Sequence, residues 1–129
     1  LFDGVLEQRN GELQLRTGFA NYTLPPRMAA GLLRSQTALG TQKVLCGIRA
    51  EDVAVDGTED AMRNAPQGVI DLVEPLGSDV FVSIALGADM LLARAHPDLP
   101  LQETQKTAVL LNLSKLHLFD ATSGHNLVV

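Results

Sequence analysis

Apolar and polar residues alternate along most of this chain, in short runs where every second residue is apolar. A period of two is typical of β-strands that bury one face. The clearest run has its apolar side chains at Val80, Val82, Ile84 and Leu86. Similar alternation occurs at 13–15, 44–48 and 109–113. The pattern predicts an all-β protein.

Turn-forming residues separate these runs at intervals of about 8–12 residues, which is the rhythm of a barrel or sandwich. Asn10 and Gly11 both tolerate positive φ and predict a tight hairpin. The helical signal is confined to 27–33, where we expect one or two turns. The polar segment 56–67 predicts a long surface connection between two apolar lobes that share one core.

Composition narrows the functions that the chain can perform. It has 129 residues, of which 46% are hydrophobic and 4% aromatic, and a net charge of −5. Few aromatic side chains and singly scattered basic residues argue against nucleic acid as a partner. No apolar run approaches the roughly 20 residues of a membrane helix. The chain starts at Leu1 without an initiator Met or signal segment, so we expect a piece of a longer cytosolic protein.

Candidate chemical groups are few. Cys46 lies inside an apolar run, where a small buried apolar residue is the expected role rather than a nucleophile. His96, His117 and His125 lie on separate segments, without the spacing of a zinc site. The five carboxylates within 51–60 lack the offsets of a calcium loop and predict a solvated acidic loop. Without a phosphate loop or nucleophile motif, we predict no catalytic, cofactor or metal site in this chain.

Three motifs end strand-like segments on charged or glycine-containing turns. They are Val44-Leu45-Cys46-Gly47-Ile48-Arg49-Ala50-Glu51-Asp52, Val73-Glu74-Pro75-Leu76-Gly77 and Leu116-His117-Leu118-Phe119-Asp120. Arg49 and Glu51 are two residues apart at a strand end, so they can point the same way and pair with each other or with another chain. Pro75 and Gly77 predict a sharp change of direction, where a strand leaves one sheet and enters another.

In this order the motifs resemble the C-terminal regulatory region of the ATP-binding subunit of sugar-type ABC importers, the maltose or glycerol-phosphate kind. The first family motif reads Gly-Ile-Arg-Pro-Glu, and Ala50 stands here in place of the proline. The family pattern Val-x-Glu-x-Leu-Gly, followed by an alternating strand, is matched by 73–86, and Arg94 matches a later basic residue. The resemblance implies an OB-like half at 1–55 and a TOBE half at 68–129.

The resemblance also implies roles for individual residues and partners for the chain. Regulatory or interface positions would be Arg49, Glu51, Glu74 and Arg94, and structural positions would be Gly47, Gly77, Phe119, Asp120 and Gly124, with Phe119 packed inward. The chain would be a regulatory and dimerisation domain, cytoplasmic at the inner face of the cell membrane. Its partners would be a second copy, the parent ATPase domain, membrane permease subunits and a regulatory protein. ATP and Mg would be bound by the parent and not by this chain.

A module of a different class stays open as an alternative. Related TOBE-type modules bind oxyanions, and OB-like barrels expose a ligand-binding face. The chain could therefore bind a small oxyanion or an oligosaccharide between its lobes. Its isolated basic residues and scarce aromatic residues do not indicate a particular pocket.

Overall fold

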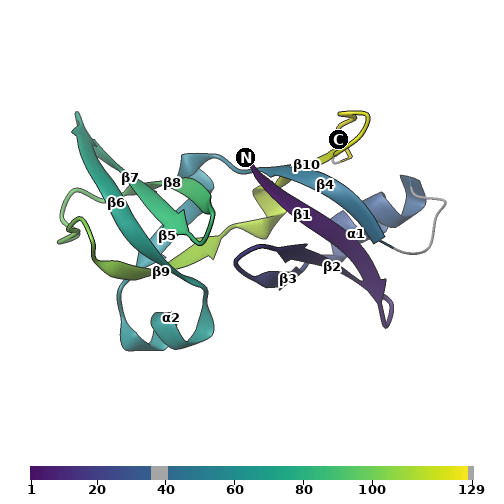
Figure 1. Ribbon diagram of the computed structural model, residues 1–129, viewed down its shortest axis with the longest axis horizontal. Coiled ribbons are helices and arrows are strands. Elements are labelled where there is room, and N and C mark those ends of the chain that lie inside the picture. Colours follow the sequence, from purple (N-terminus) through teal and green to yellow (C-terminus); the bar gives the residue numbers. More distant parts are fainter. Residues whose placement is uncertain (36–40, 128–129) are drawn as a thin grey trace. The chain divides into compact units, whose positions relative to one another are not determined.

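The computed structural model describes residues 1–35 and 41–127 and consists mainly of β-strands in two five-stranded sheets (Figure 1). This confirms the predicted all-β class. The chain divides into two compact units: unit 1 contains Leu1–Ile48 and Leu113–Val129, and unit 2 contains Arg49–Asn112. Unit 2 is therefore an insertion in the sequence of unit 1, and these boundaries differ from the predicted division into 1–55 and 68–129.

Unit 1 contains an antiparallel sheet with the strand order β10-β4-β1-β2-β3. Its strands are β1 (Phe2–Arg9), β2 (Glu12–Thr17), β3 (Asn21–Thr23), β4 (Thr41–Gly47) and β10 (His117–Asp120). Helix α1 (Pro26–Ser35), which includes the predicted helical segment, packs against β2, and a 3-10 turn η2 (Leu113–Lys115) precedes β10. The most deeply buried side chains of unit 1 include Phe2, Leu6, Leu13, Leu15, Leu32, Val44, Cys46 and Leu118.

Two local predictions for unit 1 are confirmed. Asn10 and Gly11 have φ of 54° and 78° and connect β1 to β2, which pair up to Arg9 and Glu12. Positive φ at both central residues is the geometry of a type I′ hairpin turn. Cys46 is fully buried and forms no disulfide, as expected for a small apolar residue in the core.

Unit 2 contains the sheet β5-β9-β6-β7-β8, in which all pairs are antiparallel. Its strands are β5 (Val53–Asp56), β6 (Gln67–Leu76), β7 (Asp79–Leu86), β8 (Asp89–Ala95) and β9 (Lys106–Leu111), and the helical segments are η1 (Ala50–Asp52) and α2 (Glu59–Asn64). The two edge strands, β5 and β8, also contact each other, so the sheet curls towards a barrel. Its buried side chains include Val53, Ile70, Val82, Ile84, Leu86, Leu91, Ala93 and Val109.

The turn at Gly77 corrects one prediction. β6 and β7 are neighbours in one sheet, and Leu76 pairs with Asp79 across the two-residue turn. Gly77 has φ of 65°, which fits the first central position of a type II′ hairpin turn. The expected passage from one sheet to another is therefore wrong. Pro75 is tolerated because β6 pairs with β9 only as far as Val69, which leaves one side of its later part without a partner strand.

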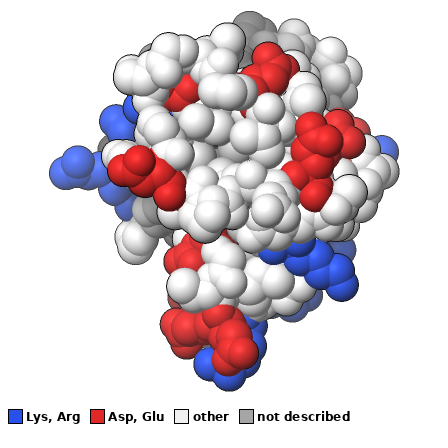
Figure 2. Space-filling view, turned by 90° about the vertical axis from the view of Figure 1, so that its left-hand side faces the viewer, with Lys and Arg blue, Asp and Glu red and all other residues white. Residues whose placement is uncertain are grey.

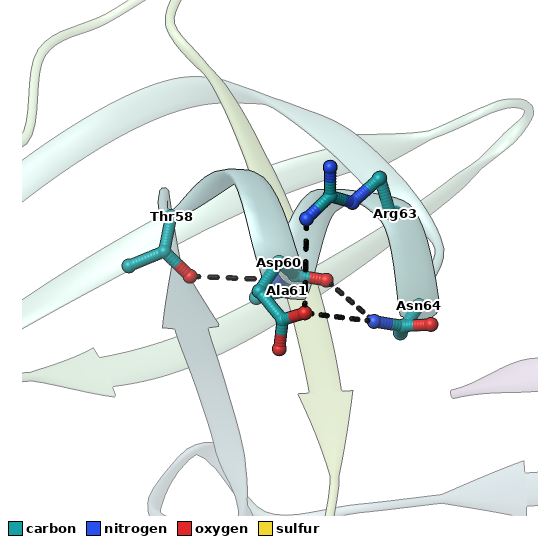
Figure 3. A network of polar contacts seen from close by, with 5 residues as sticks. All are labelled: Thr58, Asp60, Ala61, Arg63 and Asn64. Carbon is teal, nitrogen blue, oxygen red and sulfur yellow. Dashed lines mark hydrogen bonds and ion pairs between the residues drawn. The ribbon is translucent and has the colours of Figure 1, made fainter.

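The predicted surface connection contains the short helix α2 (Figure 3). The Thr58 hydroxyl accepts the N–H of Ala61 at 3.3 Å, and acidic residues occupy the first turn. Asn64 donates to the carbonyl oxygen of Asp60 at 2.8 Å, and the Arg63 guanidinium lies 3.9 Å from the Asp60 carboxylate. A threonine N-cap, an acidic first turn and a basic last turn stabilise a helix even without a buried residue.

Candidate interaction surface

The predicted site lies at the start of unit 2, where Arg49 is the N-cap residue of η1 and Glu51 is inside it. The Asp52 N–H donates to the Arg49 carbonyl at 2.9 Å and closes the turn. Arg49 has extended backbone, with φ of −78° and ψ of 151°, and Ala50 is the first residue of the helical turn. A residue before proline prefers this extended conformation, and proline favours a first helical position. The turn therefore has the shape that the family's proline would impose, although alanine stands there.

Glu51 pairs with Arg94 and not with its neighbour in sequence. Its Oε2 lies 3.7 Å from Nη2 of Arg94 on β8, the strand that η1 contacts. Among the described ion pairs there is none between Arg49 and Glu51, and the Arg49 side chain is exposed. Both side chains of the Glu51–Arg94 pair are almost half exposed, so water screens the interaction and it contributes little to stability.

Glu74 and Arg94 lie on one face of the unit 2 sheet. Glu74 on β6 is opposite Phe81 on β7, and Phe81 is opposite Arg94 on β8. Directly paired residues point to the same face of a sheet, so the three side chains form a row with Phe81 in the middle. Two strand spacings separate the acidic from the basic residue, a distance of about 10 Å. Of the four predicted interface residues, Glu51 therefore pairs with Arg94 on β8, and Glu74 shares a row with Arg94 from β6, two strands away, whereas Arg49 joins neither.

Large apolar side chains continue this face beyond the row. Leu72 and Leu92 lie on either side of Ser83, and Val69 and Met90 lie on either side of Ala85. We call this surface of β6, β7 and β8 the outer face; its members are Val69, Leu72, Glu74, Leu76, Asp79, Phe81, Ser83, Ala85, Met90, Leu92 and Arg94. Five of the eight large apolar side chains that are exposed in the described part of the chain belong to it.

The exposure of these side chains is high for apolar residues. Leu72 is 40% exposed, Met90 49% and Leu92 47%, whereas Ile84 and Ala93 on the opposite face are fully buried. Figure 2 looks towards the side of the molecule where β6, β7 and α2 are drawn in Figure 1, and shows a broad uncharged area with acidic groups spaced around it. This surface was not predicted from the sequence. Its signal was the apolar run 90–92, which departs from strict alternation.

Asp120 and Gly124 form one turn at the end of β10. The Asp120 carboxylate accepts the backbone N–H groups of Thr122 and Ser123, at 2.9 and 2.7 Å, and the Gln42 side-chain amide at 2.7 Å. These hydrogen bonds, the one from Ser123 foremost, lower the pKa of Asp120 to about 2. Gly124 has φ of 76°, and its N–H donates to the Asp120 carbonyl at 2.9 Å.

We expect the ionised Asp120 carboxylate in this turn to stabilise the folded protein in a way that depends on pH. Because the pKa of Asp120 is about 2 in the folded chain and about 4 in an unfolded one, its stabilisation is complete above about pH 4. It is lost as pH falls from about 4 to about 2. Asp120→Asn should lower the melting temperature at pH 7 and flatten its fall in that acid range. Melting curves from pH 7 to 2 test this, with the exposed Asp71→Asn as control; equal acid slopes for Asp120→Asn and wild type would contradict it.

Phe119 does not pack inward, which corrects another prediction. Leu118 is opposite Cys46 and fully buried, whereas Phe119 lies on the other side of β10 and is only half-buried. Gly47 is buried beneath this side of the strand: a Cβ atom there would lie 3.1 Å from Cδ2 of Leu1 and 3.9 Å from Cε2 of Phe119. The glycine therefore leaves room for two apolar side chains to cover the backbone.

Unit 1 contains a groove of about 580 Å³. Arg16 and Lys43, which lie on either side of Val5 across β1, contribute its basic groups, and Asp3 contributes an acidic one. Arg16 is also paired with Glu7 at 3.1 Å.

Within residues 1–35 and 41–127, no three His, Cys, Asp or Glu side chains gather as a metal site would require. Neither of the two described α-helices has the length and apolar character needed to cross a membrane.

Comparison with known proteins places the chain in a family. The sulfoquinovosyl glycerol transport ATP-binding protein SmoE of Agrobacterium fabrum is 34% identical over 100 residues, which are 78% of this chain and 27% of SmoE. The trehalose/maltose import ATP-binding protein MalK of Thermococcus litoralis is 29% identical over 91 residues, which are 64% of this chain and 23% of MalK. The aligned part is therefore about a quarter of each of these curated relatives.

A solved structure of the cytoplasmic molybdate-binding protein ModG, with molybdate bound, has the same fold. Its TM-score is 0.67 at 17% identity, and the match covers 91% of this chain and 92% of that one. Residues 46–119, more than half of the chain, match the family model of the TOBE domain. The resemblance found in the three motifs is thereby confirmed, and this chain belongs to the TOBE domain family.

Proposed function

We propose that this chain is the regulatory and dimerisation domain of the ATP-binding subunit of an ABC importer that takes up a carbohydrate or a related solute. The TOBE match over residues 46–119, together with relatives that are ATP-binding proteins for sulfoquinovosyl glycerol and for trehalose or maltose, carries this proposal. Because the chain spans only about a quarter of those relatives, the ATPase chemistry would belong to the rest of such a protein.

The proposal includes the partners and the location of the domain. In the parent subunit it would work beside the ATPase domain, with a second copy of itself, with membrane permease subunits and with a regulatory protein. It would lie in the cytoplasm, at the inner face of the cell membrane. ATP and Mg would bind to the parent and no cofactor to this chain. The net charge of −5 and the scattered basic residues support the expectation that nucleic acid is not a partner.

A nucleotide titration tests the proposal that ATP binds to the parent subunit outside this chain. We expect no saturable change in the signal of a fluorescent ATP analogue when the isolated chain is titrated at millimolar Mg-ATP. The parent subunit, as positive control, should bind in the same assay. Saturable binding to the isolated chain in the micromolar range would contradict the proposal, because the nucleotide site would then lie in the TOBE region itself.

Sedimentation equilibrium tests the proposed self-association. The fold offers a surface that a two-fold symmetric pair could share, and small interfaces below about 1,200 Å² hold transient complexes. We therefore expect a monomer at micromolar concentration and a reversible increase in mass towards the dimer at millimolar concentration. A monomer over the whole range would show that this chain does not dimerise by itself.

Binding of a small oxyanion or an oligosaccharide is the second candidate function. The ModG-like fold and the groove of about 580 Å³ with Arg16 and Lys43 favour it. The groove lies within unit 1, whereas the sequence led us to expect a ligand between the lobes. The Glu7 carboxylate already neutralises Arg16 in part. Titration calorimetry with molybdate, sulfate and maltodextrins distinguishes the two candidate functions. Saturable heat with any of these ligands would favour ligand binding over the regulatory and dimerisation role.

A further inference from the structure

We propose that Asn10 is a site of spontaneous covalent modification, at which the backbone nitrogen of Gly11 displaces the side-chain amide and the asparagine becomes aspartate or isoaspartate. The geometry and the exposure of the turn between β1 and β2 carry this inference (Figure 1). It goes beyond the proposed function and does not depend on it.

The reacting groups are accessible because they form the tip of a hairpin. Arg9 pairs with Glu12, and the hydrogen bonds that close such a turn join these flanking residues. The central residues Asn10 and Gly11 are both exposed. Glycine has no side chain to shield its nitrogen, and a Cβ atom at Gly11 would have no neighbour within 4 Å. The nitrogen can therefore reach the Asn10 side chain when the last pair frays, which costs little at the end of a hairpin.

The reaction needs only water and hydroxide. After hydroxide removes its proton, the Gly11 nitrogen attacks Cγ of Asn10; the new N–Cγ bond forms, the Cγ–Nδ2 bond breaks, and the amide nitrogen leaves as ammonia. Water then opens the resulting cyclic imide. Opening at Cγ restores the ordinary peptide bond and leaves an aspartate. Opening at the backbone carbonyl carbon gives isoaspartate, in which the main chain runs through the side chain. The net change exchanges one ammonia for one water.

Two other acidic pairs with the same spacing, Asp3-Gly4 and Asp56-Gly57, lack this freedom. Gly4 is buried inside β1 and is paired with both neighbouring strands, so the ladder holds its backbone in place. The Asp56 carboxylate accepts the backbone N–H of Thr58 at 2.9 Å, which lowers its pKa and keeps it ionised. An ionised carboxylate resists attack by a nucleophile, whereas the neutral amide of an asparagine does not.

The other four asparagines all precede residues with side chains, which hinder the approach of the nitrogen; these pairs are Asn21-Tyr22, Asn64-Ala65, Asn112-Leu113 and Asn126-Leu127. Two of the pairs are also held by hydrogen bonds. The Asn64 amide donates to the carbonyl oxygen of Asp60 at 2.8 Å. The N–H of Leu127 donates to the carbonyl oxygen of Leu118 at 2.8 Å. Asn10 is therefore the asparagine that the fold leaves most open to this reaction.

The two products should affect the fold differently. Aspartate adopts positive φ as asparagine does, so it should keep the turn while adding one negative charge to the net charge of −5. Isoaspartate adds a carbon atom to the main chain of the two-residue turn that sets the register of β1 and β2. Because β1 also pairs with β4, this product should loosen the middle of the unit 1 sheet.

Peptide mapping by mass spectrometry tests the site. The folded chain is incubated in mildly alkaline and in mildly acidic buffer, and loss of the amide is followed at every asparagine. Asn10 should lose its amide first, and faster in the alkaline buffer, because hydroxide starts the reaction. In denaturant at mildly acidic pH, where carboxyl groups are partly protonated, Asp3 and Asp56 should also form isoaspartate. In the folded chain these two residues should not.

Asn10→Gly is the matched control. Gly-Gly also suits a type I′ turn, so the variant should fold like the wild type but has no amide to lose. After the same incubation, hydrogen exchange of the backbone amides in β1 and β2 should become faster in the wild type and stay unchanged in the variant. Exchange in unit 2 should stay unchanged in both proteins.

Each outcome supports the inference or contradicts it. If another asparagine reacts first, or if Asn10 reacts only in denaturant, the turn protects the site and the inference is wrong. If Asn10 reacts without faster exchange in β1 and β2, the modification site is supported and the loosening of unit 1 is wrong. Neither result changes the proposed place of the domain in a transport ATPase.

Discussion

Replacing Gly68 by alanine should destabilise the protein by about 1–3 kcal/mol, the cost of overpacking a closely packed core. Gly68 is buried on β6, and a Cβ atom at this position would lie 2.5 Å from Cγ2 of Ile84 and 2.9 Å from the carbonyl oxygen of Ala85. The carbonyl belongs to the backbone of β7, so relief requires a movement of the strand and not only of a side chain. Chemical denaturation of both proteins measures the difference.

Gly31→Ala is the matched control, with an effect of the opposite sign. Gly31 is exposed in α1, and a Cβ atom there would have no neighbour within 4 Å. Alanine inside a helix is favoured over glycine by about 0.8–1.0 kcal/mol, so this substitution should stabilise the protein. If Gly68→Ala left the denaturation midpoint unchanged, the close approach of β6 and β7 described above would be incorrect.

Gly77→Val should cost about 1–3 kcal/mol, for a different reason. A Cβ atom at Gly77 would meet nothing within 4 Å, so the whole cost comes from φ of 65°, which a β-branched residue adopts poorly. Gly77→Asn should cost less than Gly77→Val, because asparagine adopts positive φ more often than a β-branched residue does. Thermal melts of the two variants, compared at equal concentration, give the difference.

Arg49→Ala and Glu51→Lys are the surface counterparts of that substitution. Both residues are exposed, and the Glu51–Arg94 contact is 3.7 Å long, so we expect stability to change by no more than about 0.5–1 kcal/mol. Their effect should instead appear in transport by the full-length importer proposed above. If Glu51→Lys unfolded the domain and Gly77→Val did not, the separation of structural from regulatory residues would be wrong.

The sequence predicts best those features that depend on neighbouring residues. Asn10-Gly11 fixes the first hairpin, and the alternation in 80–86 identifies the buried side of β7. Helix α2 was missed because it buries no residue and so has no apolar period, although its threonine cap and acidic first turn are visible in the sequence. The unit boundaries were missed because β10 pairs with β4, which lies about 70 residues earlier, and alternation does not reveal such distant partners.

In the candidate surface too, the features that depend on nearby residues could be predicted from the sequence, and those that depend on distant packing could not. The resemblance singled out Glu74 and Arg94 separately, but their common row depends on the register of three strands. That register is set by two-residue turns, because Leu76 pairs with Asp79 and Leu86 with Asp89. Both turns contain a glycine with positive φ, so the row could have been derived from the turns. The contact between Glu51 and Arg94 could not, because it depends on the packing of η1 against β8.

The insertion of unit 2 within unit 1 sets the order in which a nascent chain can complete its parts. All strands of unit 2 lie between residues 49 and 112, so its sheet can close as soon as that stretch has left the ribosome. Unit 1 begins earlier and finishes later, because β10 is made last and pairs with β4. Until then β4 presents one unpaired edge, and an open edge can recruit a strand from another chain. Slow synthesis of the stretch that contains β10 would therefore expose unit 1, and not unit 2, to aggregation.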